Sequence, residues 1–294
     1  MSGTSTGYFD DADTFQSVQG LGTRLAGAVS NALARLAGFE RDRTPGVWPH
    51  LDRVQLCAGL KRRVSNPDGI DQYTSNVCGV AAVVRTWAFD SPEQYVAFAL
   101  DLYLRGSARM AGARGRCSRM VRASSELKAA APRPGMNHAD WIVLASIRAA
   151  LNDVFDYSPG EGIFAIKAWT TPADVEREFR AFGYTRIRNQ ATLSSTHGYD
   201  NLMQASHLYL SGWRVVLLIH SRLLDKATRP VVSYPDHWVG LDSAITLCVA
   251  PGPPSIYPFR VWTWAKPTTI PMDDKPVPLS TLIDNYFGFV AGLF

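Results

Sequence analysis

Two side chains six positions apart could supply a nucleophile and an oxyanion donor. Cys78 follows a polar, turn-forming stretch and begins the mostly apolar segment CGVAAVVRTWAF, which predicts a buried helix. Free N–H groups and the positive dipole end at a helix start lower the pKa of a thiol, so we expect a thiolate. Gln72 in the same loop, together with the backbone N–H of Cys78, could bind an oxyanion, and Gly79 would let a substrate backbone approach. The alternative interpretation is a loop glutamine and a buried structural thiol.

A cysteine nucleophile also needs a base, which can come from a distant part of the sequence. Among the six histidines, His237 is best placed, because it follows the turn Ser-Tyr-Pro-Asp and opens the strand-like segment HWVGLD. We expect its ring at the edge of a sheet, facing outward. His197, in the polar loop SSTHGYD, is the second choice. The remaining four lie in a linker, on predicted helices or at the end of a buried strand: His50, His138, His207 and His220.

The stretch Q-Y-T-S-N-V-C-G, residues 72–79, resembles the signature of papain-like cysteine peptidases, in which a Gln precedes the Cys-Gly of the central helix. The order of later segments is also similar: a buried VVLLI strand, then D-H-W-V-G-L, then a strand ending V-W-T-W-A. Bacteriocin-processing, NlpC-like and effector peptidases share this order. The resemblance covers residues 70–90 and 212–266, roughly a quarter of the chain. The helical middle, 91–211, is more similar to bacterial effector and toxin members than to plant enzymes.

The sequence departs from this resemblance at the residue that orients the histidine. In papain-like enzymes it is an Asn or Asp two residues before a Trp, and aligning that Trp with Trp264 puts Trp262 in its place. Thr263 is the nearest polar side chain. Asp242 lies five residues beyond His237, which predicts the opposite face of the strand and a distance of roughly 16 Å. Either Thr263 or a backbone carbonyl orients the ring, or the site is a dyad, or the enzyme is impaired.

The elements that must position these residues indicate an α+β fold, because helical patterns come first and strand-like segments later. The resemblance implies a papain-like arrangement, with the nucleophile on a central helix packed on a C-terminal antiparallel sheet. Helices are predicted over residues 14–39, 78–89, 92–105, 138–155, 172–182, 200–211 and 279–294. Strands are predicted over residues 213–220, 237–242, 244–250 and 259–265. The basic, Ala- and Gly-rich residues 106–135 indicate a solvated insertion, or alternatively a loop lining a groove.

We divide the chain into residues 1–45, a tail with an amphipathic helix, and residues 46–294, a papain-like peptidase domain with a helical insertion around 91–211. Residues 1–10 read as disordered. Apolar residues recur every three or four positions in 14–39, which predicts a helix packed on the domain. A segment for delivery, carrier binding or docking to a membrane surface is the alternative.

Composition excludes several classes of protein. The net charge of +4 is far from the basic stripe of a nucleic-acid binder. The four cysteines are scattered, so we expect neither a zinc site nor a disulfide framework. No Sec signal, apolar span of membrane length, phosphate-binding loop or paired-His metal motif is present, and no cofactor is implied. We expect synthesis in the cytoplasm and, if the protein acts elsewhere, export by a route other than Sec.

These residues predict thiolate-mediated acyl transfer by Cys78 and His237. The resemblance implies a cysteine peptidase or amidase acting on a protein or peptide, as a bacterial secreted effector or interbacterial toxin. An immunity protein or a secretion-system carrier would then be its partner. A transglutaminase or deamidase would use the same site. A binding module that kept the fold and lost the chemistry is the alternative from another class.

Overall fold

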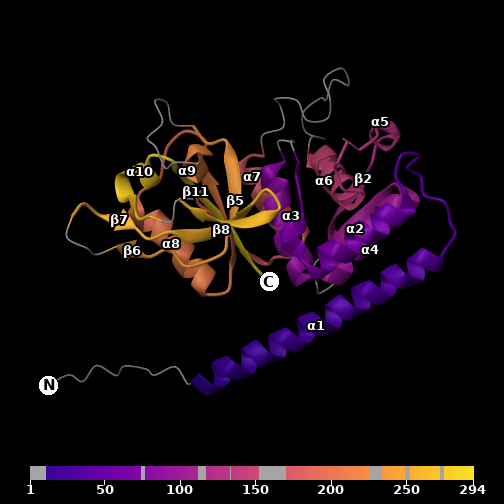
Figure 1. Cartoon of the computed structure of the whole chain (residues 1–294), viewed down its shortest axis with the longest axis horizontal. Coiled ribbons are helices and arrows are strands. Elements are labelled where there is room, and N and C mark those ends of the chain that lie inside the picture. The colour runs from indigo at the N-terminus through magenta and orange to yellow at the C-terminus, as the bar shows by residue number, and fades with distance from the viewer. Residues whose placement is uncertain are drawn as a thin grey trace.

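A computed structural model describes residues 11–73, 77–111, 117–132, 134–151, 170–225, 234–248, 252–271 and 275–294, without the side chains of 11–25, 117 and 118. It confirms the predicted α+β class, with helices in the N-terminal part and an antiparallel sheet in the C-terminal part (Figure 1). The predicted disorder of residues 1–10 lies outside the described residues. No helix in the described ranges is long and apolar enough to cross a bilayer.

The N-terminal part is a group of packed helices with one hairpin. The elements are α1 (Asp11–Arg41), α2 (Arg53–Ser65), the short η1 (Pro67–Gly69), α3 (Cys78–Asp90), α4 (Pro92–Arg105), α5 (Ser125–Ala129), α6 (His138–Leu151) and α7 (Pro172–Ala181). Strands β1 (Ser107–Ala111) and β2 (Cys117–Arg122) pair as an antiparallel hairpin between α4 and α5.

The C-terminal part is built on a six-stranded sheet with the order β3-β11-β4-β5-β8-β9. Its strands are β3 (Arg186–Asn189), β4 (Arg214–Ile219), β5 (His237–Leu241), β8 (Phe259–Thr263), β9 (Lys266–Ile270) and β11 (Tyr286–Leu293), all paired antiparallel. Three helices belong to this part: α8 (Tyr199–Leu210), α9 (Arg222–Asp225) and α10 (Leu279–Ile283). A second, smaller sheet has the order β10-β7-β6, from Val277–Pro278, Ser255–Ile256 and Leu247–Cys248.

The sheet is covered on both faces, as its apolar strands require. Along β4, Val216 and Leu218 belong to the core made with the N-terminal helices, while Val215, Leu217 and Ile219 belong to a second core. This alternation follows from the two-residue period of a strand. Figure 1 shows α2, α4 and α6 on one side of the sheet and α8 and α10 on the other. The prediction that residues 213–220 form a strand buried on both sides is confirmed.

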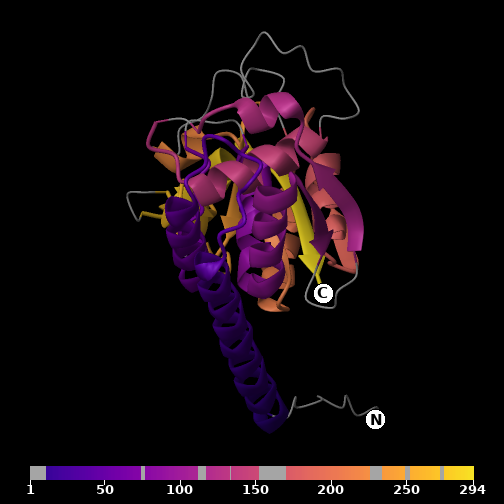
Figure 2. The same cartoon turned by 90° about the vertical axis from the view of Figure 1, so that its right-hand side faces the viewer.

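Helix α1 reaches past the helices that it packs against. Its C-terminal part lies on α2 and α4, where Ala32, Leu36 and Phe39 are buried. The guanidinium of Arg53 lies 4.1 Å from the centre of the Phe39 ring. The N-terminal part of the helix extends beyond the body in both views (Figures 1 and 2). The apolar pattern of residues 14–39 is therefore used for packing over the last three turns.

The prediction of a final helix over residues 279–294 is wrong beyond Ile283. Helix α10 ends there, and Tyr286–Leu293 form β11 between β3 and β4. A strand buried on both faces reads as a continuous apolar run, and such a run does not distinguish strand from helix. Gly288 has φ +99°, and a Cβ there would lie 2.0 Å from the carbonyl oxygen of Gln190. The neighbouring chain segment therefore requires glycine at this position.

The prediction of a solvated insertion over residues 106–135 is also wrong in the described part. Ala108, Met110, Val121 and Leu127 are buried in the core formed with the N-terminal helices. The alternation of these residues with arginines is a strand pattern that the overall basic composition obscured. Residues 112–116 and 133 lie outside the described residues, as do 152–155 of the predicted helix 138–155 and 249–250 of the predicted strand 244–250.

Candidate active site

Cys78 is the first residue of α3, as the sequence predicts. The helix forms because the residues after it are apolar and almost all buried, from Gly79 to Val84. Val77 precedes the helix and offers no side-chain cap, so the first backbone N–H groups of α3 are not satisfied in that way. A Cβ at Gly79 would lie 2.6 Å from Cγ2 of Thr170. A neighbouring side chain of the protein therefore disfavours any larger residue here, and the approach of a substrate backbone to Gly79 stays a prediction.

His237 is the first residue of β5 and lies beside the start of α3. Strand β5 packs on α3, and the backbone N–H of Trp238 is close enough to the Cys78 thiol to stabilise its charged form. The carboxylate of Asp236 raises the pKa of both Cys78 and His237, although burial has the larger effect on each. The two residues predicted as nucleophile and base therefore lie in one electrostatic environment, although 159 positions separate them.

The imidazole of His237 is held by the last residue of β8 and by the first residue of the turn that leads to β9. Its Nε2 lies 2.6 Å from Oγ1 of Thr263, a contact that is buried. Its ring stacks on Trp264 with 4.8 Å between the ring centres and 27° between the planes. Trp264 adopts φ +46°, a conformation that costs energy for an aromatic residue and that turns its ring over the histidine. The prediction of an outward-facing ring is wrong, because His237 is only 5% exposed.

Burial sets the protonation of this pair. It raises the pKa of the Cys78 thiol to about 11, although the amides of Trp238, Gly79 and Cys78 itself oppose the change. Burial also lowers the pKa of His237 to about 4, with Asp236 opposing. The expectation of a lowered thiol pKa is wrong, because desolvation of the charged form outweighs the helix start. At neutral pH the resting protein holds a thiol and a neutral imidazole.

Gln72 is buried in the loop between η1 and α3, with 7% of its surface exposed. The next residue, Tyr73, has φ +53°, and its backbone N–H donates to Oδ1 of Asp71 over 2.7 Å. Residues 74–76 lie outside the described residues. The structure therefore places Gln72 in the segment that leads to the nucleophile, and its role as an oxyanion donor stays a prediction.

Trp262 and Asp242, which the sequence excludes as residues that orient His237, contact other residues. The indole N–H of Trp262 donates to the carbonyl of Asp68 over 2.8 Å. Both carboxylate oxygens of Asp242 accept from Arg85 over 2.8 Å. Arg85 follows Cys78 by seven residues, about two turns of helix. The contact between Arg85 and Asp242 therefore lies about two helical turns from Cys78, along the line where α3 packs on β5.

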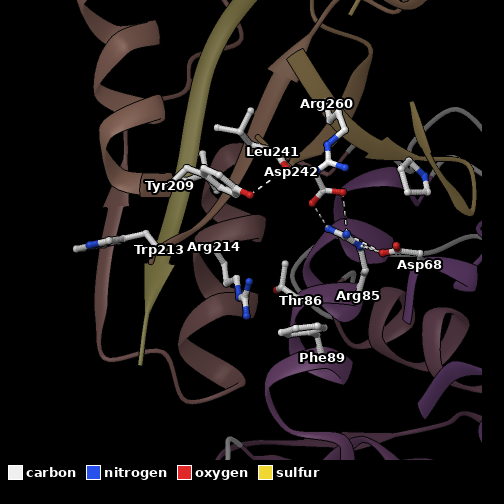
Figure 3. A pocket seen from close by; sticks show the side chains of 12 residues that line it. Asp68, Arg85, Thr86, Phe89, Tyr209, Trp213, Arg214, Leu241, Asp242 and Arg260 are labelled. Atoms are coloured by element: carbon white, nitrogen blue, oxygen red, sulfur yellow. Dashed lines mark hydrogen bonds and ion pairs between the residues drawn. The ribbon is translucent and has the colours of Figure 1, made fainter. Parts of the chain in front are cut away.

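A cavity of about 300 Å³ opens at the contact between Arg85 and Asp242 (Figure 3). Its charged side chains pair among themselves: Arg85 contacts Asp68 and Asp242, and Arg214 contacts Asp90 just outside the lining. With Arg260, three cations meet three carboxylates. Because these charges sum to zero, the cavity does not call for a charged ligand, and we assign it to the packing of helices against sheet. The sequence did not predict this cavity.

The second histidine that the sequence offers as a base does not contact Cys78. His197, the second choice for the base, lies before α8, and its backbone N–H donates to the carbonyl of Tyr286 over 2.9 Å. Its Nε2 is buried without a hydrogen-bond partner. Within the described residues, no three His, Cys, Asp or Glu side chains gather as metal ligands.

Comparison with known proteins gives no relative for this geometry. No family model matches the chain, and neither a curated protein nor a solved structure is significantly similar to it.

The buried imidazole predicts a loss of stability in acid. Above the ordinary histidine pKa of 6.5 the folded and unfolded chains both hold it neutral, but as the pH falls from there to about 4 only the unfolded chain takes up the proton. Between about pH 7.5 and pH 4.5 we expect the difference in pKa between the unfolded and folded chains to cost the folded state about 2–3 kcal/mol. His237→Gln should remove that part of the pH dependence in urea unfolding. An identical pH dependence in the variant would contradict the buried, neutral ring.

Proposed function

We propose that this protein is a cysteine peptidase or amidase of papain-like type. Cys78 is the nucleophile, His237 the base, Thr263 the residue that orients the imidazole, and Gln72 an oxyanion donor. The observation that carries the proposal is the contact of His237 Nε2 with Thr263, made by a histidine whose strand begins beside the thiol. That contact leaves Nδ1 as the nitrogen available to Cys78.

The reaction begins from neutral partners. When a substrate carbonyl replaces water beside the thiol, His237 Nδ1 takes the Cys78 proton as the sulfur–carbon bond forms. Thr263 Oγ1 then accepts a hydrogen bond from the imidazolium Nε2–H, and the Asp236 carboxylate favours the positive charge. The backbone N–H of Cys78 and the amide of Gln72 donate to the oxyanion. The imidazolium returns its proton to the leaving amine, which leaves a thioester on Cys78.

The second half of the reaction decides the class of enzyme. Water, deprotonated by His237, attacks the thioester carbon, the carbon–sulfur bond breaks, and the Cys78 sulfur takes the proton back from the imidazolium as the acid leaves. The overall reaction is proteolysis, amidase action or deamidation. An amine in place of water gives transglutamination by the same residues. We favour hydrolysis of a protein or peptide. In line with the resemblance, we propose a bacterial effector or interbacterial toxin, exported by a route other than Sec, with an immunity protein or secretion carrier as partner.

A binding module is the second candidate, and the electrostatics of the site favour it. A thiol pKa of about 11 and a histidine pKa of about 4 keep both groups uncharged, and a threonine hydroxyl stabilises an imidazolium less than a carboxylate does. In this case the segments around Cys78 would bind a peptide without cleaving it.

Trapping the thioester separates the two candidates. The protein is incubated with a mixture of N-acetylated peptide p-nitrophenyl esters, quenched in acid and mapped by mass spectrometry. We expect acyl groups on Cys78 and at least about tenfold less on Cys57 and Cys248, because Cys78 is the one of these three described cysteines that lies beside a histidine base. His237→Ala should reduce the acylation of Cys78 to the level of the other thiols. Equal, slow acylation of all the cysteines, unchanged in His237→Ala, would rule out the enzyme and leave the binding module. Adding a primary amine after acylation distinguishes transfer from hydrolysis.

A further inference from the structure

The loop that carries Gln72 is tied to a buried ion pair on the helical side of the protein. Asp140, near the start of α6, is 1% exposed, and its carboxylate oxygens accept from Nε of Arg63 on α2 over 2.9 and 3.2 Å and from Nη2 of the same residue. Oδ2 of Asp140 also accepts from the backbone N–H of Asp71 over 3.2 Å. One buried oxygen thus joins a guanidinium to the residue immediately before Gln72.

The connection continues through the loop. Oδ1 of Asp71 accepts from the backbone N–H of Tyr73, so the carboxylate closes a turn around Gln72. Tyr73 keeps φ +53° in this turn, a conformation that a non-glycine residue holds only when its surroundings fix it. A Cβ at Gly135 would lie 3.2 Å from the Tyr73 hydroxyl, so the ring rests on the turn before α6.

The other end of the same segment is fixed by the sheet. The carbonyl of Asp68 accepts from Trp262 of β8, and its carboxylate pairs with Arg85 of α3 (Figure 3). The backbone from 68 to 73 is therefore held from both halves of the molecule. Asp140 belongs to the helical half, and its carboxylate fixes the position of residue 71 by a charge-assisted hydrogen bond from the backbone N–H of Asp71.

We propose that Asp140, with its charge balanced by Arg63, is a positioning residue that sets the geometry of the Gln72 loop for oxyanion binding. This inference rests on the proposed function, since it assigns Gln72 a purpose. Asp140 touches no reacting atom and acts through Asp71. An oxyanion donor contributes only if it is preorganised, which is what a buried, fully paired anchor provides.

Two double variants isolate the hydrogen bond from the charge. Arg63→Met with Asp140→Leu removes the ion pair and leaves the N–H of Asp71 without an acceptor. Arg63→Met with Asp140→Asn removes the same charges but keeps an amide oxygen in the place of Oδ2. Replacing both members of a buried ion pair by apolar residues is often neutral for stability. Thermal unfolding checks that both variants fold. Asp71→Ala, matched with Asp71→Asn, tests the next link at a half-buried loop residue.

Two readouts are needed. Amide hydrogen exchange at Asp71 and Tyr73 reports whether the loop is held. Affinity for N-acetyl peptide aldehydes, which form an oxyanion on the thiol, is compared with alkylation by iodoacetamide, which does not. In the double variant with Asp140→Leu, we expect amide exchange to be at least about tenfold faster and aldehyde affinity to be about tenfold weaker. In Asp71→Ala we also expect a weaker affinity for the aldehyde. The asparagine variants should resemble the native protein, and alkylation should be unchanged in all.

Each outcome decides a separate statement. Unchanged exchange in the leucine double variant would overturn the positioning role whatever the activity. Faster exchange with unchanged aldehyde affinity would overturn the link between this loop and the oxyanion. A native protein that binds no aldehyde counts against the proposed function, and the exchange measurement still decides whether Asp140 holds the loop.

Discussion

Replacing Cys78 with alanine is expected to abolish acyl transfer and to leave the fold intact. Loss of a nucleophile removes the covalent route, so the rate should fall by at least about 10³-fold. The substitution deletes the desolvated sulfur of Cys78, a residue that is half-buried as a whole, and alanine is a good residue within a helix. We expect the free energy of unfolding to change by less than about 1 kcal/mol. Hydrolysis of peptide p-nitrophenyl esters and thermal unfolding measure the two effects.

Cys248→Ala is the matched control for this experiment. Cys248 is also half-buried, but it lies in β6 of the small sheet. Its replacement should leave the rate unchanged. Activity that survives in Cys78→Ala, or that disappears equally in Cys248→Ala, would show that the thiol at position 78 is structural.

Replacing Arg85 with methionine is expected to destabilise the junction between helices and sheet. The guanidinium contacts Asp242 at the end of β5 and Asp68 in η1, and it lies over the ring of Trp262 at 5.4 Å. Methionine fills a similar volume but leaves two partly buried carboxylates without a cation. We expect a loss of about 2–4 kcal/mol, below the range for fully buried pairs because Asp68 is partly solvated. Urea unfolding at neutral pH provides the measurement.

Arg105→Met provides the contrast. Arg105 pairs with Asp101 one helical turn away, and its side chain is 70% exposed. Such a pair contributes little, so the change should stay within about 0.5 kcal/mol. Equal effects of the two substitutions would contradict a special role of Arg85 at the junction.

The sequence predicted those parts of the site that depend on local order. A turn before an apolar helix indicated Cys78, and a turn before a strand indicated His237, because element boundaries follow from turn residues and apolar runs. When Trp264 is aligned with the tryptophan of papain-like enzymes, the orienting position falls on Trp262, and Thr263 is the nearest polar side chain. The structure brings the hydroxyl of Thr263 to the imidazole of His237. Their catalytic roles stay predictions.

The predictions that the structure contradicts concern properties that depend on tertiary contacts. The thiol pKa was expected to fall because a helix begins at Cys78, but the degree of burial, which local sequence does not contain, raises it. Residues 286–293 were assigned to a helix because an apolar run buried on all sides looks the same in either conformation. The sequence does not indicate Asp140, because Asp140 and Asp71 are 69 positions apart and come together only when α2 and α6 pack.

The place of β11 in the sheet has a consequence for biosynthesis. This strand joins β3 and β4, whose residues are made much earlier, and it completes the backbone pairing of both. Until residue 293 has left the ribosome, the emerging polypeptide carries two edges that can pair with other chains. The protein should therefore depend on holding chaperones during translation, and a chain that stalls before residue 293 has emerged should aggregate.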